Sequence, residues 1–134
     1  MSREIKFRAW DKHEKRMLDV YRISFDGPIE GAQVHCYLDD RGGKGSTEYS
    51  YDGDGLILEQ FTGLKDKNGK DIYEGDLLKF KILFSDDDYE VGQVIWSNQD
   101  AGFVLKCFNL WKVALRAEIV GNIHENTELL EADQ

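Results

Sequence analysis

The sequence predicts an all-β protein, a small barrel or sandwich of short antiparallel strands with at most short helical turns. Apolar and polar residues alternate over many short segments. Turn-forming residues separate these segments at close spacing, which is typical of sandwiches and small barrels. No long amphipathic helical pattern is present. The chain of 134 residues is long enough for one domain or for two small modules.

In the first half of the chain, the segment REIKFRAW predicts a strand with Ile5, Phe7 and Ala9 on a core face. The opposite face would carry Lys6, Arg8 and Trp10. Further strands are expected over residues 17–25, 33–38, 47–51 and 56–61. The polar, Gly-rich segment 39–46 predicts a surface loop. Residues 1–60 are therefore interpreted as an N-terminal β module with a Gly-rich loop at 39–46.

In the second half, strands are expected over residues 76–84, 90–96, 102–107 and 118–123. The pattern over residues 110–117 is ambiguous between strand and helix, and residues 126–131 are expected to form a helical turn. The composition changes near residue 60. Residues 61–134 are therefore interpreted as a C-terminal module that resembles a small β-barrel.

The stretch FTGLKDKNGKDIYEGDLLKF, residues 61–80, is rich in carboxylates. Counted from Asp66 as an EF-hand calcium loop, it has Lys70 at the fifth position and Leu77 at the twelfth, where oxygen ligands are required. The pair Asn68-Gly69 instead predicts a tight hairpin turn, because both residue types tolerate positive φ. Gly75-Asp76 predicts a second turn, and Gly121 is interpreted as a turn or bulge position.

No segment predicts catalysis. The chain has no Gly-x-Ser-x-Gly motif and no Cys/His set with metal-ligand spacing, and GGKGST does not match a P-loop. Cys36 and Cys107 lie in apolar, strand-like surroundings and are expected to be free, buried thiols in a reducing compartment. We therefore predict a protein that is not an enzyme and that has no catalytic residues, no cofactor and no metal.

The net charge of −9, with a pI of about 4.8, disfavours nucleic acid as a partner of the whole chain. Residues 1–16 are an exception, with six Lys or Arg against three Asp or Glu. Lys6, Arg8 and Arg16 are therefore candidate contacts to phosphate or to a partner, although pairing with acidic residues of the same fold is the favoured interpretation. Aromatic residues in the strands favour a core or a protein interface over base stacking.

No apolar run approaches the length of a membrane span, and no signal peptide precedes Trp10. The expected location is therefore the cytoplasm, with no membrane partner.

Three segments of the chain are distinctive as a set: IKFRAWDKHEKRML at 5–18, EQFTGLKDKNGKDIYEGDLLKF at 59–80 and EIVGNIHENTELL at 118–130. Together they resemble the YopX family of phage and prophage proteins. Thr127 stands where family members commonly have proline. The resemblance implies an all-β fold, a phage or prophage origin and action in the cytoplasm of a bacterial host. It implies no catalytic residues.

Three functional hypotheses follow. The first is a non-enzymatic accessory protein that binds a host or phage protein and that could also self-associate through strand edges. The second is a nucleic-acid-binding small barrel that uses the basic N-terminal strand. The third is an acidic DNA mimic that occupies a host DNA-binding protein.

Overall fold

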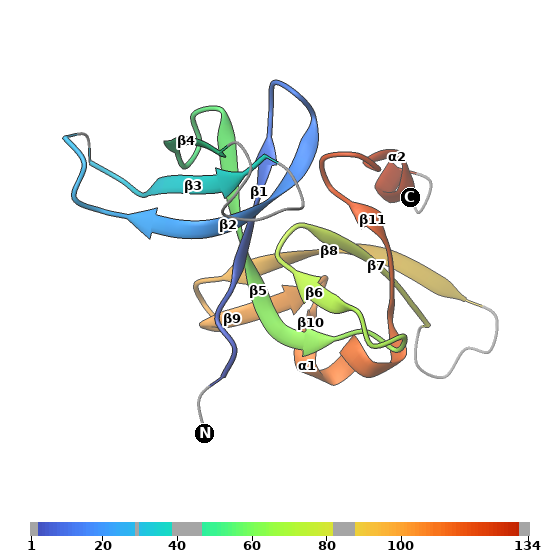
Figure 1. The fold of residues 1–134 in the computed structure, drawn as a ribbon. Helices are drawn as coiled ribbons and strands as arrows, with labels where there is room; N and C mark the ends of the chain where they lie inside the picture. Colours follow the sequence, from blue (N-terminus) through green and yellow to red (C-terminus); the bar gives the residue numbers. More distant parts are fainter. Residues whose placement is uncertain (1–2, 29, 39–46, 82–87, 132–134) are drawn as a thin grey trace. The chain divides into compact units, whose positions relative to one another are not determined.

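The computed structural model describes residues 3–28, 30–38, 47–81 and 88–131. The protein is mostly β, with two antiparallel sheets and only short helical turns, as the sequence predicts (Figure 1). The first sheet has the order β4-β3-β2-β1-β5-β6 and the second β10-β9-β8-β7-β11. The described strands do not close into a barrel. The Gly-rich loop expected at 39–46 lies outside the described residues.

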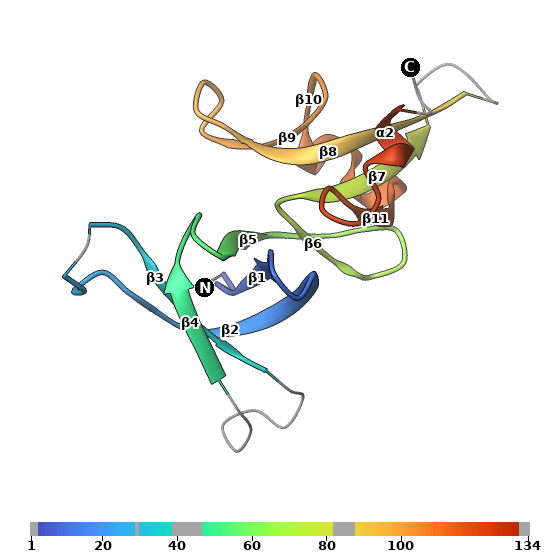
Figure 2. The same ribbon diagram turned by 90° about the horizontal axis from the view of Figure 1, so that it is seen from above.

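The chain divides into two compact units, Ile5–Gln60 and Phe61–Gln134 with Met1–Glu4, which are described separately below. The first contains β1 (Phe7–Asp11), β2 (Arg16–Ser24), β3 (Gln33–Tyr37), β4 (Thr47–Tyr51) and the start of β5 (Leu56–Lys65). Each strand pairs antiparallel with its spatial neighbour, and Figure 2 shows β2 next to β3. We call this unit the N-terminal unit.

Apolar residues on one face of these strands form the core of the N-terminal unit: Ala9, Leu18, Val34, Cys36 and Leu56. The alternation predicted for the first strand is only partly correct. Ala9 is fully buried, but Ile5 is exposed because it precedes β1, where strand pairing begins. The expected polar face of β1 is buried as well, with Trp10 nearly inaccessible and Arg8 in an ion pair.

The second unit contains the rest of β5, then β6 (Asp71–Tyr73), β7 (Asp76–Lys81), β8 (Tyr89–Ser97), β9 (Gly102–Leu105), β10 (Phe108–Asn109) and β11 (Glu118–Asn122). Its short helices are α1 (Leu110–Val113), the 3₁₀ turn η2 (Ala114–Arg116) and α2 (Glu128–Glu131). The ambiguity over residues 110–117 is thus resolved as helix. We call this unit the C-terminal unit.

Residues of β7, β8, β9 and α1 pack into the core of the C-terminal unit, with Phe80, Val94, Leu105 and Leu110 at its centre. Leu110, Val113, Ala114 and Ala117 are all buried in this core, and their spacing is that of one helical face. Burial of Leu110, Val113 and Ala114 on one side favours helix over residues 110–116, and Ala117, with φ −102 and ψ 159, returns to extended backbone. Residues 82–87, which include part of the strand expected to end at 84, lie outside the described residues.

The loop between β5 and β6 is a tight turn that contains Asn68 and Gly69. Asp66 N donates a hydrogen bond of 2.9 Å to Lys70 O, and Gly69 N donates one of 3.0 Å to Asp66 O. Gly69 has φ +80, whereas Asn68, contrary to expectation, is not among the residues with positive φ. The Asp66 carboxylate supports the turn, because it accepts hydrogen bonds from the backbone N–H groups of Asn68 and Lys70.

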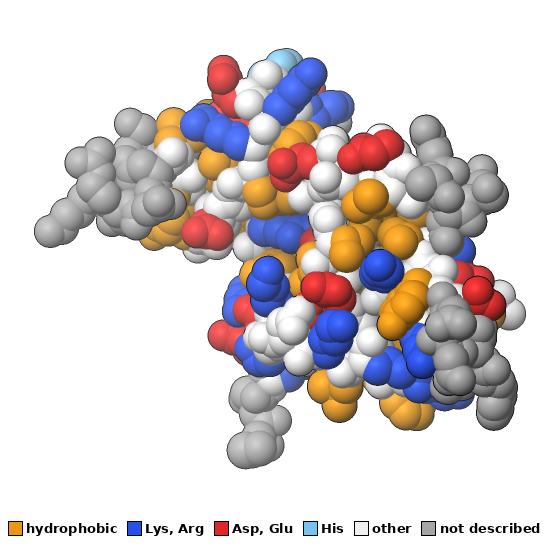
Figure 3. Space-filling view, turned by 90° about the vertical axis from the view of Figure 1, so that its right-hand side faces the viewer, with side chains coloured by type: hydrophobic (Ala, Val, Ile, Leu, Met, Phe, Trp, Pro, Cys, Tyr) orange, Lys and Arg blue, Asp and Glu red, His pale blue; other side chains and the backbone are white. Residues whose placement is uncertain are grey.

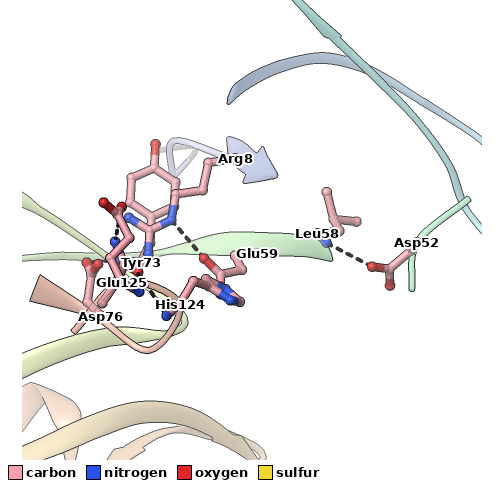
Figure 4. A network of polar contacts seen from close by, with 9 residues as sticks. Arg8, Asp52, Leu58, Glu59, Tyr73, Asp76, His124 and Glu125 are labelled. Carbon is pink, nitrogen blue, oxygen red and sulfur yellow. Dashed lines mark hydrogen bonds and ion pairs between the residues drawn. The ribbon is translucent and has the colours of Figure 1, made fainter. Parts of the chain in front are cut away.

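Gly75 lies between β6 and β7. Asp76 is the first residue of β7, and its Oδ2 accepts a hydrogen bond of 2.8 Å from Tyr73 N (Figure 4). Gly121 lies where the β11–β7 register shifts. A Cβ atom at Gly121 would come within 2.3 Å of Asn126 Oδ1, so only glycine fits there.

Cys107 is exposed, contrary to the expectation of a buried thiol, because it lies in the turn between β9 and β10. Among the described residues, no helix has the length and apolar character needed to cross a membrane.

Candidate functional site

Four aromatic rings lie in a row across β2, β3 and β4 of the N-terminal unit. Tyr21 stacks on Tyr37 with 4.5 Å between ring centroids, and His35 stacks on Tyr49 with 5.3 Å. The centroids of Tyr21 and His35 are 6.0 Å apart and join the two pairs. Tyr21 and Tyr49 are 44% and 64% exposed. We call Tyr21, His35, Tyr37 and Tyr49 the aromatic row.

The strand register explains how the row forms. His35 is the cross-strand partner of both Arg22 and Tyr49, so these side chains share one face of the sheet. The core residues Val34 and Cys36 alternate with His35 and point to the opposite face. A bulge between Val20 and Arg22 adds one residue to β2. In a regular strand Tyr21 and its neighbour Arg22 would point to opposite faces, so Tyr21 would point toward the core. The bulge instead places Tyr21 on the same face as Arg22 and His35.

The row lies beside a sheet edge. In the strand order β4 comes last, and no described strand pairs with its outer side. Such an edge presents backbone N–H and C=O groups that an extended segment of another chain can pair with. Aromatic side chains and backbone donors are thus available on neighbouring parts of one surface.

Two surface pockets include a residue of the row in their lining. Beside Tyr21, a pocket of about 250 Å³ is lined by Lys6 and Arg22 as well as by apolar residues such as Phe7. A second pocket, of about 310 Å³, is lined by Asp11, His13, Glu48, Tyr49, Ser50, Asp54, Gly55 and Leu56. We call the second one the acidic pocket. Glu48 is the cross-strand partner of the core residue Cys36, so its side chain lies on the face of the sheet opposite to the aromatic row.

Asp11 of the acidic pocket has a structural role. Its Oδ1 accepts hydrogen bonds from the backbone N–H groups of His13 at 3.0 Å and Glu14 at 3.1 Å, in the turn that joins β1 to β2. Arg16 Nε lies 3.6 Å from Asp11 Oδ2. Burial alone would raise the pKa of Asp11, but the two N–H groups, a hydrogen bond with Glu48 and the charge of Arg16 outweigh it and lower the pKa.

Glu48 on β4 is the other member of this carboxyl pair. Burial raises its pKa, and the hydrogen bond to Asp11 together with the negative charge of Asp11 raises it further. The pair therefore favours one shared proton, carried by Glu48. Glu48 Oε1 is buried and has no hydrogen-bond partner among the described residues.

We expect Glu48→Gln to raise the free energy of unfolding by about 1 kcal/mol at pH 7, because the amide keeps a donor for Asp11 without adding a second charge. A raised pKa in the folded state means that protonated Glu48 stabilises the fold below its ordinary pKa of 4.5. That stability is lost as pH rises through the raised pKa. Urea unfolding from pH 4 to 8 measures both effects, with the exposed Glu30→Gln as control. Equal pH dependence in Glu48→Gln and wild type would contradict the assignment.

The candidate basic residues lie in different surroundings. Arg8 Nε donates a hydrogen bond of 2.9 Å to Glu59 Oε1, and both side chains are largely buried (Figure 4). Arg16 is near Asp11, as described above, and Lys6 lines the pocket beside Tyr21. The fold therefore does not gather Lys6, Arg8 and Arg16 into one site. Lys and Arg side chains are interspersed with Asp and Glu on the face shown in Figure 3.

Neither the Cys36 thiol nor the Ser50 hydroxyl is arranged as a nucleophile. Burial first, and then the charges of Glu48 and Asp11, raise the pKa of Cys36 to about 12. Ser50 Oγ donates a hydrogen bond to the backbone oxygen of Asp54. His, Cys, Asp and Glu side chains form no group of three that could hold a metal ion within the described ranges.

The model of the YopX protein family matches residues 6–131, which is nearly the whole chain. The chain belongs to the YopX family.

The crystal structure of protein EF1440 from Enterococcus faecalis is similar to this YopX-family protein, with a TM-score of 0.65 and 30% sequence identity. The match covers 96% of this chain and 99% of that one. No curated protein matches. The resemblance seen in RAWD, TGLKDKNGKDIYEGD and IVGNIHEN is thus confirmed. The similar crystal structure supports the fold, and its description states no activity.

Sequence reasoning on this YopX-family protein missed the combination that forms the aromatic row. Tyr21, Tyr37 and Tyr49 lie in strands that the sequence predicts, but no local pattern places their rings beside His35. The bulge at Tyr21 and the pairing of His35 with Tyr49 depend on strand register. The alternation of Gln33, His35 and Tyr37 against Val34 and Cys36 was the available signal that one face of β3 is polar and aromatic.

Proposed function

We propose that this YopX-family protein is a non-enzymatic accessory protein that binds another protein through the aromatic row and the adjoining edge of β4. The observation that supports this most strongly is the row itself, two stacked ring pairs joined by a tilted contact on one sheet face, with Tyr49 mostly exposed. Tyrosine offers a large amphipathic contact area at low entropic cost, and it is enriched in protein interfaces.

Charge favours a polypeptide over a nucleic acid as the partner. Arg22, the cross-strand partner of His35, is exposed beside Tyr21 and suits a carboxylate of a polypeptide. The net charge of −9 counts against a nucleic acid, whose phosphates the chain as a whole would repel.

The other two hypotheses have weaker support. The aromatic row could stack bases, but Arg8 and Arg16 are each close to a carboxylate of the same unit. A DNA mimic needs carboxylates spaced like phosphates, and the face in Figure 3 mixes both signs of charge. We further propose a phage or prophage origin, which the family resemblance implies, and action in the cytoplasm of the bacterial host.

An affinity capture from a nuclease-treated lysate of the source organism tests the proposal. Tagged wild type is compared with Tyr21→Ala/Tyr49→Ala and with Tyr89→Ala, which removes an exposed aromatic residue of the C-terminal unit. We expect a stoichiometric protein whose measured affinity falls at least about tenfold in the double variant, since aromatic anchors dominate interface energies. Tyr89→Ala should leave that affinity unchanged.

Each component of the proposal can fail separately in this experiment. Equal affinity of wild type and Tyr21→Ala/Tyr49→Ala would contradict the assigned face. Proteins that vanish after nuclease treatment would favour nucleic acid as the partner. A substrate turned over by the purified protein, with loss of activity on a point substitution, would contradict a non-enzymatic role.

A further inference from the structure

The helical segment 110–116 in the C-terminal unit exposes two large apolar side chains. Leu110, Val113 and Ala114 are buried in the core, so the residues between them point away from it. Trp111 is 67% exposed and Leu115 is 80% exposed. Because they are four positions apart, they lie on one side of the helical segment. Figure 1 shows this segment as the short coil between β10 and β11.

The same segment is positively charged, although the unit as a whole is negatively charged. Residues 61–134 contain eight Lys or Arg against fourteen Asp or Glu, but residues 109–117 contain two cations and no acidic residue. These cations, Lys112 and Arg116, directly follow Trp111 and Leu115 and are exposed. Lys112 Nζ lies 5.5 Å from the centroid of the Trp111 ring. Neither cation forms an ion pair within the part of the chain that the structure describes.

We infer that Trp111, Lys112, Leu115 and Arg116 form a second docking surface, which inserts its apolar pair into a pocket with an acidic rim on a protein partner. Trp and Arg are the residue types most enriched among the energetic centres of interfaces. An acidic rim is the complement of the two cations, which have no carboxylate partner among the described residues of their own chain.

Charge also disfavours a second copy as the occupant. A two-fold interface brings the same patch of each subunit together, so Lys112 and Arg116 would face their own equivalents. This surface goes beyond the proposed function, because it lies in the other unit and consists of different residues.

Site-specific photocrosslinking tests the inference. Benzoylphenylalanine is placed at Leu115, which leaves Trp111 intact, and at Ile95 as an exposed control on β8. The variants are irradiated in a nuclease-treated lysate of the source organism. We expect one protein adduct from position 115 only, attached to a partner peptide that contains Asp or Glu. Trp111→Ala should reduce its yield at least about tenfold.

Charge variants provide the matched control. Lys112→Glu/Arg116→Glu should reduce the yield of the adduct as strongly as Trp111→Ala does. Lys70→Glu/Lys79→Glu reverses two exposed positive charges elsewhere in the same unit and should leave the yield unchanged. Tyr21→Ala/Tyr49→Ala should leave the adduct intact, so failure of the aromatic row and failure of this surface are distinguishable.

Several results would overturn the inference. They are the absence of an adduct at position 115, an adduct that is a second copy of the chain, an adduct unaffected by charge reversal, and one lost after nuclease treatment. Trp111-dependent sedimentation with phosphatidylglycerol vesicles would assign the surface to an anionic membrane instead.

Discussion

Replacing Asp66 with Ala is expected to lower the free energy of unfolding by about 3–4 kcal/mol. Asp66 is almost completely buried, and its carboxylate accepts backbone hydrogen bonds from Asn68, Lys70 and Ile119 at 2.8, 3.0 and 3.0 Å. Alanine leaves these N–H groups without their acceptor. It also removes one of the connections from the β5–β6 loop to β11, because Ile119 lies in that strand. Urea unfolding monitored by Trp fluorescence measures the loss.

Lys67→Ala is the matched control, because it changes an exposed side chain of the same loop and should cost no more than about 0.5 kcal/mol. The pH dependence is a second check. Burial would raise the pKa of Asp66, but the three N–H groups outweigh it and lower the pKa below 3.8. Its contribution is therefore complete above pH 3.8 and is lost as pH falls through the folded-state pKa. Asp66→Ala should lack this acid-dependent loss, and equal stability of Asp66→Ala and Lys67→Ala would refute the assignment.

Arg8→Met should cost about 2–4 kcal/mol, because it leaves the buried Glu59 carboxylate without the guanidinium that it contacts. Arg22→Met provides the comparison, since Arg22 is the same residue type on an exposed part of the same unit. Its expected effect is within about 0.5 kcal/mol. Denaturant unfolding of both variants gives the difference.

A double variant separates the ion pair from simple loss of packing. Arg8→Met/Glu59→Gln removes the buried charge and should recover at least about 1 kcal/mol relative to Arg8→Met. No recovery would indicate that Arg8 stabilises the unit through its aliphatic part alone. An Arg8→Met variant as stable as wild type would instead reopen the possibility that Arg8 contacts a partner.

Strand positions were predictable because a half-buried strand leaves a two-residue period in the sequence. Val34 and Cys36 alternate with His35 and Tyr37, and the strand forms there. The helical turn at 110–116 was not assigned, because several buried residues at close spacing also suit a buried strand. The turn at 66–70 carries a local signal in Asn68-Gly69, but its attachment to β11 carries none, because the hydrogen bond between Asp66 and Ile119 joins residues 53 positions apart.

The candidate site was less accessible to sequence reasoning than the fold. Asp11 lies in the RAWD segment, but its partner Glu48 comes from β4, and only the pairing of β3 with β4 brings them together. The favoured interpretation of the basic N-terminus, that it pairs within its own fold, describes Arg8 and Arg16. Coulomb attraction predicts such pairing in general terms, but the choice of Glu59 for Arg8 depends on the β1–β5 register.

The two cysteines have a practical consequence for any of these experiments. Cys36 is buried with a pKa of about 12, and Cys107 is exposed in a turn. Because the thiolate is the reactive species, a maleimide dye at pH 7 should modify the native protein once, at Cys107. The natural sequence thus offers a unique attachment point on the C-terminal unit for fluorescence anisotropy or surface immobilisation. Denaturation should expose the second thiol, so the number of dyes bound also reports unfolding.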